Sequence, residues 1–261
     1  MGQGSWRLDD DDPKEAVAAL RRGIDLGMAH VDTAESYGDG EVETIVGEAI
    51  AGRRKVFLVS KVSPGHASRH GTVTACERSL TRLRTEYLDC YLLHWPGRHP
   101  LADTIAAFEQ LVHDGKIRTW GISNFNEEEV DEAVHVAGPN RIACNQVLYH
   151  LEERSIEHYV IPTCEKNNIA VVAYSPYGQG RFRSHHVLEE IARSKEATPR
   201  QVALRFLVRH PIVFTIPKAG STAHVEENAG SGDFWLTEDE IRRIDEAFPA
   251  SKPRRGHVPV L

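Results

Sequence analysis

Val56-Phe57-Leu58-Val59 and Ala170-Val171-Val172-Ala173 are two runs in which four consecutive residues are apolar. A strand with one solvated face would alternate apolar and polar residues, so uninterrupted runs indicate strands covered on both faces. Similar short runs recur along the chain, each followed by a stretch with helical periodicity, which indicates the α/β class. We predict strands at residues 28–32, 56–60, 88–93, 118–122, 142–147, 170–174 and 212–216.

Helix start and stop signals fall between these runs. Asp12-Pro13 joins an N-cap residue to a proline at the first helical position, and Gly27 follows the end of the same predicted helix. Thr198 and Thr237 are each followed three residues later by Gln or Glu, the pattern of a capping box. Asn126 begins a weaker version of the same pattern.

Residues 1–4 could form the end of one more strand, which brings the number of predicted strand–helix units to eight. Their mean repeat of roughly 30 residues is typical of a TIM barrel. The rival is an open, doubly wound sheet. No GxGxxG motif opens a helix after any predicted strand, and no long linker divides the chain. We therefore predict one (β/α)8 TIM barrel domain over residues 1–261.

The composition argues against several classes of protein. The 261 residues carry a net charge of −7 with no basic stripe, so we expect no nucleic-acid partner. No apolar run reaches about 18 residues and no signal-like N-terminal segment occurs, so we expect no membrane association and a cytoplasmic location. The 4 cysteines form no CxxC pair, so we expect no disulfide. His66 and His70 are spaced i, i+4 and His185 and His186 are adjacent, but no carboxylate stands nearby at metal-ligand spacing, so we expect no metal site.

Four polar side chains stand at or just after successive predicted strands. Asp32 ends one strand and Tyr37 follows in its loop, while Lys61 and His94 end the next two strands. Active sites of TIM barrels lie at the C-terminal ends of the strands. An acid, a phenol, an amine and an imidazole are therefore expected at one mouth of the barrel.

In this order and context the four residues resemble the catalytic tetrad of the aldo-keto reductase superfamily. The resemblance covers essentially the whole chain and implies reversible hydride transfer between NADPH and the carbonyl carbon of a small aldehyde or ketone. The motifs that carry it are Asp32-Thr33-Ala34 with Tyr37-Gly38, Ser60-Lys61, Leu93-His94-Trp95, Gly121-Ile122-Ser123-Asn124-Phe125, Asn145-Gln146, Tyr174-Ser175-Pro176 and Ile216-Pro217-Lys218.

Elementary chemistry agrees with these roles. As hydride arrives, the carbonyl oxygen becomes negative, so the site must stabilise an oxyanion and supply a proton. A lysine ammonium ~4 Å from a phenolate attracts it with up to roughly 4 kcal/mol at an effective dielectric of about 20. That attraction is enough to lower a tyrosine pKa of ~10 by about 1.5 units. We assign Tyr37 as the general acid, with its pKa lowered by Lys61. Asp32 would keep Lys61 charged, and His94 would donate a hydrogen bond to the carbonyl oxygen.

The resemblance also implies a cofactor site. Ser123, Asn124 and Gln146 would bind the nicotinamide carboxamide, with Tyr174 stacked on the ring and Ser175 beside it. A helix N-terminus attracts phosphate, and the residues expected on the adenosine side are Lys218 at the 2′-phosphate, then Ser221, His224, Glu227 and Asn228. Many relatives carry arginine where His224 stands, and histidine lacks arginine's permanent charge and five-donor fork. We expect NADPH, with use of NADH open.

The chain departs from the family pattern at both ends. It begins near the end of the first strand, so the usual N-terminal hairpin and most of that strand are missing, and neighbouring strand edges should be poorly paired. The segment after Phe248 is short and basic, which suggests an open pocket with broad specificity. Trp6 and Trp95 both follow strand ends and should line that pocket.

The alternative function is a non-catalytic nucleotide-binding accessory protein of the same fold, because some relatives are accessory subunits of ion channels. The intact tetrad argues against it. A metal-dependent barrel hydrolase needs His and carboxylate clusters at strand ends, and beyond Asp32 and His94 none is visible. We expect a small-molecule carbonyl substrate and a monomer.

Overall fold

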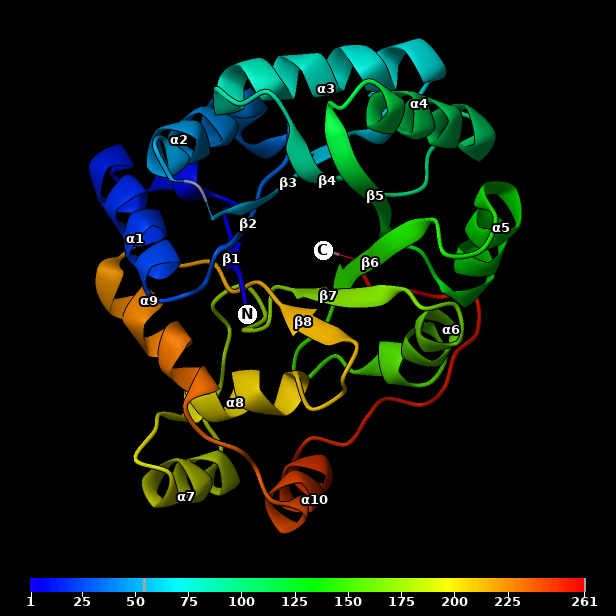
Figure 1. Cartoon of the computed structure of the whole chain (residues 1–261). Helices are drawn as coiled ribbons and strands as arrows, with labels where there is room; N and C mark the ends of the chain where they lie inside the picture. Colours follow the sequence, from blue (N-terminus) through cyan, green and yellow to red (C-terminus); the bar gives the residue numbers. More distant parts are fainter. Residues whose placement is uncertain (54, 261) are drawn as a thin grey trace.

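Eight parallel strands form a barrel surrounded by helices (Figure 1). The computed structural model describes residues 1–53 and 55–260. Each strand pairs with the next in chain order, and the ring closes where Gly2 N donates to Thr215 O (2.9 Å) and Gly4 N donates to Pro217 O (3.1 Å). The predicted (β/α)8 barrel is confirmed. The strands are β1 Gln3–Gly4, β2 His30–Asp32, β3 Phe57–Val62, β4 Leu88–Leu93, β5 Ile117–Ser123, β6 Ile142–Leu148, β7 Ala170–Tyr174 and β8 Val213–Thr215.

The helices lie outside the ring of strands (Figure 1). They are α1 Pro13–Asp25, α2 Glu41–Ile50, α3 Arg69–Leu83, α4 Leu101–His113, α5 Glu127–Ala137, α6 Val160–Lys166, α7 His186–Ser194, α8 Pro199–Leu207, α9 Thr222–Ala229 and α10 Glu238–Ala247. Short 3-10 helices occupy Leu8–Asp10, Tyr37–Gly40, Pro64–His66, Ser155–Glu157 and Gly230–Gly232. Within the described part of the chain, no helix combines the length and apolar character needed to cross a bilayer.

The predicted helix starts are confirmed by their hydrogen bonds. Asp12 accepts from two backbone N–H groups at the start of α1. Asn126, Thr198 and Thr237 each form a complete capping box, at α5, α8 and α10 respectively. Each cap satisfies backbone donors that have no partner within the helix, so these helices begin where the sequence predicts.

The register of β3 explains how one residue of the site is positioned. Leu58 packs in the large core between strands and helices, and the Ser60 hydroxyl donates to Glu43 of α2 (2.5 Å). Since side chains alternate across a strand, Lys61 points to the opposite side, into the barrel. The apolar layer on that side is made of Val59, Cys90, Leu92, Cys144, Val172 and Ile216.

The first strand is short but well paired, so the expectation of poorly paired edges is wrong. Gln3 and Gly4 pair with β2, and Gly2 and Gly4 complete the ring through the bonds to the β8 side. The buried Gln3 side chain adds two hydrogen bonds, from Nε2 to Leu20 O (3.1 Å) and to Met28 O (3.0 Å). These bonds fasten the first strand to α1 and to the segment before β2.

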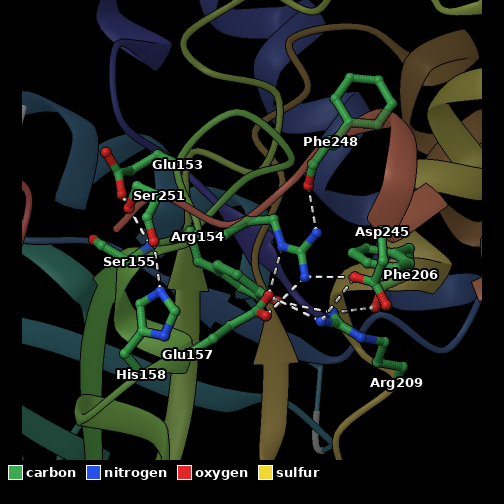
Figure 2. A network of polar contacts seen from close by, with 11 residues as sticks. Glu153, Arg154, Ser155, Glu157, His158, Phe206, Arg209, Asp245, Phe248 and Ser251 are labelled. Carbon is green, nitrogen blue, oxygen red and sulfur yellow. Dashed lines mark hydrogen bonds and ion pairs between the residues drawn. The ribbon is translucent and has the colours of Figure 1, made fainter. Parts of the chain in front are cut away.

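The segment after α10, red in Figure 1, runs around the outside of the barrel and then across its mouth. At its start, Arg154 Nη1 donates to Phe248 O (2.5 Å), as Figure 2 shows. Further along, Gly256 N donates to Glu127 Oε1 (3.0 Å), and residues 256–258 and 260 line the central cavity. The C-terminal segment therefore forms part of the wall of the pocket.

Candidate active site

A cavity of about 680 Å³ lies at the C-terminal ends of the strands. Its wall includes Asp32 from β2, Ser123 from β5 and Tyr174 from β7, together with the loops that follow. Trp6 and Trp95 also line it, and both side chains are partly exposed. The cavity therefore brings together residues from the whole length of the chain.

Tyr37 begins a short 3-10 helix in the loop between β2 and α2. The next residue, Gly38, has φ of +52°, a left-handed conformation that glycine adopts without a steric cost. Earlier in the loop, Glu35 is buried and accepts from Ser63 N (2.8 Å), while His66 Nδ1 lies 2.9 Å from the same carboxylate oxygen. The loop that carries Tyr37 is thus fastened to the residues just after β3, the strand that carries Lys61.

Lys61 is fully buried, and its ammonium group has three oxygen partners. Nζ donates to Asp32 Oδ1 (2.6 Å), to Thr33 O (2.8 Å) and to Tyr37 OH (3.2 Å). Burial alone would lower the pKa of Lys61, but the charge and hydrogen bonds of Asp32 and Tyr37 hold it above the ordinary lysine value. Lys61 therefore stays a cation, with its charge directed at the phenol.

The pKa of Tyr37 departs from the sequence-based expectation. Burial raises it above the ordinary tyrosine value, the charge of Lys61 lowers it, Asp32 raises it, and the hydrogen bond from Lys61 lowers it again, with burial dominant. The expected net lowering of the Tyr37 pKa is wrong, because burial destabilises the phenolate more than the nearby ammonium stabilises it. Tyr37 is consequently a protonated phenol at neutral pH, ready to donate.

His94 directly follows β4 and packs edge-on against Tyr37, with ring centroids 5.7 Å apart. Burial, assisted by the charge of Lys61, lowers the pKa of His94 to about 2. The imidazole is therefore neutral and carries one N–H donor. Its Nδ1 lies 3.4 Å from Ser36 Oγ, and its backbone carbonyl accepts from Asn124 Nδ2 (3.0 Å).

The residues predicted to bind the nicotinamide lie together on one wall: Ser123, Asn124, Gln146, Tyr174 and Ser175. Ser123 Oγ donates to Gln146 O (2.8 Å), and Tyr174 OH donates to Asn124 Oδ1 (2.9 Å). Asn124 and Ser175 both have positive φ, +62° and +49°. These bonds and turns fix the direction in which the side chains meet the cavity.

The residues predicted on the adenosine side are not gathered in the same way. Lys218 lines the cavity, whereas Ser221 and His224 lie at the start of α9 and outside its wall. Ser221 is the N-cap of that helix and accepts from His224 N (3.4 Å).

Glu227 and Asn228, on the same helix, also lie outside the cavity wall. Thr198 Oγ1 donates to Glu227 Oε1 (2.8 Å), and Tyr177 OH donates to Asn228 Oδ1 (2.8 Å). Both side chains are therefore engaged within the protein, by α8 and by the loop after β7.

Sequence reasoning missed two parts of this region. One is the C-terminal segment, from which His257 and Val258 line the cavity. The other is Asp11, whose carboxylate forms an ion pair with Lys218 (2.5 Å). The acidic run at residues 9–12 is a visible signal, but nothing in the sequence indicates which of its carboxylates pairs with Lys218.

No metal centre is evident in the part of the chain that the structure describes, because no three His, Cys, Asp or Glu side chains are gathered as a metal ion requires. The four cysteines, all buried, are free thiols.

Comparisons with known proteins agree with this geometry. The sequence profile of the Aldo/keto reductase family matches residues 1–248. The chain is 46% identical over 260 residues to the methylglyoxal reductase YeaE of Escherichia coli strain K12, covering 97% of this chain and 92% of that protein. It is 34% identical over 248 residues to the glyoxal reductase of Bacillus subtilis strain 168, covering 94% and 87%. A crystal structure of an aldo/keto reductase from Klebsiella pneumoniae in complex with NADP and acetate matches with a TM-score of 0.95 and 42% identity, covering 100% of this chain and 94% of that one. The chain therefore belongs to the aldo/keto reductase family.

Proposed function

We propose that this protein reduces small aldehydes or ketones to alcohols with NADPH, and that Tyr37 is the general acid. The observation that carries the proposal is the 3.2 Å contact between Lys61 Nζ and Tyr37 OH, next to a buried Asp32, at the wall of the cavity. The names of the relatives support this reaction class, since the Escherichia coli protein is a methylglyoxal reductase and the Bacillus subtilis protein a glyoxal reductase.

The proton step follows from the state of Tyr37. Because the pKa of Tyr37 is raised, its hydroxyl is protonated at neutral pH and donates to a carbonyl oxygen as negative charge develops there. The phenolate that remains lies 3.2 Å from the Lys61 ammonium, which stabilises it. In the reverse direction the same phenolate accepts the proton of the alcohol.

Asp32 and His94 support this step in different ways. Asp32 holds the Lys61 ammonium at 2.6 Å and keeps it charged. His94, being neutral, would donate its one N–H to the carbonyl oxygen, so that the substrate oxygen lies between an imidazole and a phenol. Trp6 and Trp95, at the cavity wall, would pack on the substrate and exclude water.

The residues on the adjoining wall suit a nicotinamide cofactor, which when bound would supply the hydride. Asn124 and Gln146 have side-chain amides, whose donors and acceptors complement a carboxamide. Tyr174 offers an aromatic ring on the same wall. Two crystal structures of an aldo-keto reductase from Klebsiella pneumoniae contain NADP or NADPH. In this protein, Lys218 would contact the 2′-phosphate of that cofactor.

The test is turnover of NADPH by the purified protein with methylglyoxal, glyoxal and a panel of simple aldehydes and ketones. Tyr37→Phe should reduce kcat by about 10²- to 10⁴-fold, the usual contribution of a general acid, while NADPH binding, followed by fluorescence, is unchanged. Tyr87→Phe is the matched control, because Tyr87 is partly exposed and lies outside the cavity wall.

Two results would contradict the proposal. Turnover retained by Tyr37→Phe would remove Tyr37 as the acid. Tight NADPH binding by the wild-type protein without reduction of any carbonyl would instead favour a nucleotide-binding accessory protein.

A further inference from the structure

The loop between β1 and α1 places a carboxylate against the expected phosphate site. Asp11 forms an ion pair with Lys218 (2.5 Å), and the two side chains are 30% and 33% exposed. The segments that they join are separated by 207 positions in the chain. The pair therefore connects the first loop of the barrel to the turn between β8 and α9.

The approach of Asp11 to this turn depends on Gly220. A Cβ atom at residue 220 would lie 2.3 Å from Asp11 Oδ2, closer than any side chain tolerates. The carboxylate thus packs directly on the backbone of the turn that leads into α9. Asp11 is held there by contact with the turn as well as by the charge of Lys218.

Lys218 is the one lysine or arginine among the described residues that line the cavity. His224, on the first turn of α9, lacks the permanent charge and planar fork of an arginine. Recognition of a 2′-phosphate at this end of the cavity therefore depends heavily on Lys218, whose ammonium already has a carboxylate partner.

We propose that Asp11 is a cofactor-selectivity residue, which competes with the 2′-phosphate for the ammonium of Lys218 and narrows the preference for NADPH over NADH. The proposal rests on the cofactor site proposed above. A 2′-phosphate that approaches Lys218 either displaces Asp11 or is bound beside another negative charge, and both alternatives oppose its binding. A cofactor without the 2′-phosphate leaves the ion pair undisturbed.

The test compares Asp11→Asn with the wild-type protein in fluorescence titrations with NADPH and with NADH. Asp11→Asn should tighten NADPH binding by about two- to fivefold, the range expected for a partly exposed charge pair, and should leave NADH binding unchanged. Asp10→Asn is the matched control, since it removes the same charge from the same loop and the nearest cation to Asp10 is Arg7 at 3.8 Å. That variant should leave both affinities unchanged.

Two further measurements locate the effect. In a Lys218→Met background, Asp11→Asn should bring no gain in NADPH affinity, because the contested cation is gone. Adenosine 2′,5′-bisphosphate, compared with adenosine 5′-monophosphate, should show the same selective gain as NADPH.

The outcomes separate this proposal from the proposed function. If the wild-type protein binds neither dinucleotide, both proposals are wrong. If the wild-type protein binds NADPH, only the role of Asp11 is wrong when Asp11→Asn leaves the NADPH affinity unchanged or weakens it. The same holds when Asp11→Asn changes the affinities for NADPH and NADH equally. Asp11 would then orient Lys218 toward the phosphate or act on neither cofactor.

Discussion

The side-chain amide of Gln146 donates a 2.7 Å hydrogen bond to Asp32 Oδ2, while Lys61 Nζ donates to the other oxygen of the same carboxylate. Gln146 and Asp32 are both buried, and they come from β6 and β2. A residue predicted to hold the cofactor therefore also completes the hydrogen bonding of the acid that holds Lys61. The proposed cofactor site and the proposed proton-transfer site therefore share one buried hydrogen-bond network.

Gln146→Leu should weaken both the fold and the reaction. The substitution leaves a buried carboxylate oxygen without a donor, which costs about 1–3 kcal/mol of unfolding free energy. Urea unfolding measures that cost, and kcat should fall as well, because Asp32 is no longer held in one orientation. In an Asp32→Asn background the loss in kcat should shrink. An equal loss in both backgrounds would show that Gln146 does not act through Asp32.

Lys61→Met should be more destabilising, because it leaves the Asp32 charge buried without its cation. Removing one partner of a buried ion pair costs about 3–5 kcal/mol, which urea unfolding would detect. Lys116→Met is the control: the ion pair of Lys116 with Glu77 is partly exposed, 32% and 50%, and should contribute no more than about 1 kcal/mol to the free energy of unfolding. Adding Asp32→Leu to Lys61→Met should restore part of the stability, and a further loss would contradict a role for the uncompensated charge.

Much of the barrel was predictable from the sequence because its strands are buried on both faces. Uninterrupted apolar runs identify such strands directly, and β4 and β7 have the predicted bounds. The ends of others differ: β2 begins at His30 rather than residue 28, and β3 continues to Val62. Strand ends depend on where neighbouring strands provide partners, which is a property of the closed ring rather than of the local sequence.

The composition of the site was predictable where residues belong to strand ends, and less so where distant segments meet. Asp32, Lys61 and His94 are placed by strand register, so their convergence follows from the fold. The pairing of Asp11 with Lys218 and the path of the C-terminal segment depend on contacts between segments far apart in the chain. The pKa of Tyr37 required the extent of burial, which no motif contains.

Two histidines with lowered pKa values predict how stability depends on pH. Burial lowers the pKa of His30 from 6.5 to about 4 and that of His94 to about 2. Both are neutral in the folded protein near neutral pH, whereas in the unfolded chain they take up protons as pH falls through 6.5. Stability should therefore fall with falling pH, by up to about 1.4 kcal/mol per pH unit for each histidine. For His30 the fall should end near pH 4.

A variant isolates the contribution of His30, whose ring lies between Phe57 and Phe214 with centroids 5.2 Å and 4.8 Å away. Between about pH 6 and pH 4.5, His30→Leu should reduce the slope of unfolding free energy against pH by up to about 1.4 kcal/mol per pH unit. This change corresponds to one proton fewer taken up on unfolding. His113→Leu is the control, because the His113 side chain is 89% exposed and should leave the slope unchanged. Identical slopes for His30→Leu and the wild-type protein would show that His30 is not neutral when folded.

Arg154 connects the barrel to the C-terminal segment (Figure 2). Its guanidinium donates to both carboxylate oxygens of Glu157 (2.8 Å each), to Asp245 Oδ1 (2.6 Å) and to Phe248 O (2.5 Å). Burial alone would raise the pKa of Glu157, but Arg154 and its other donors, Tyr149 and Arg209, lower it to about 2. The network is charged at neutral pH and lies where the chain leaves α10 for the barrel mouth.

Arg154→Met should therefore release the C-terminal segment as well as destabilise the fold. In this variant Glu157 would still have Arg209 as an ion-pair partner at 2.9 Å. The loss of unfolding free energy should therefore lie toward the lower end of the roughly 3–5 kcal/mol expected when a buried ion pair is broken. Trypsin should cut the folded variant after Arg254 and Arg255 faster than it cuts the wild-type protein, because the carbonyl of Phe248 no longer has its donor. Arg242→Met is the control, since Arg242 is 60% exposed in its pairs with Asp239 and Glu246. Equal cleavage rates in all three proteins would show that Glu127 and the contacts beyond it hold the segment without Arg154.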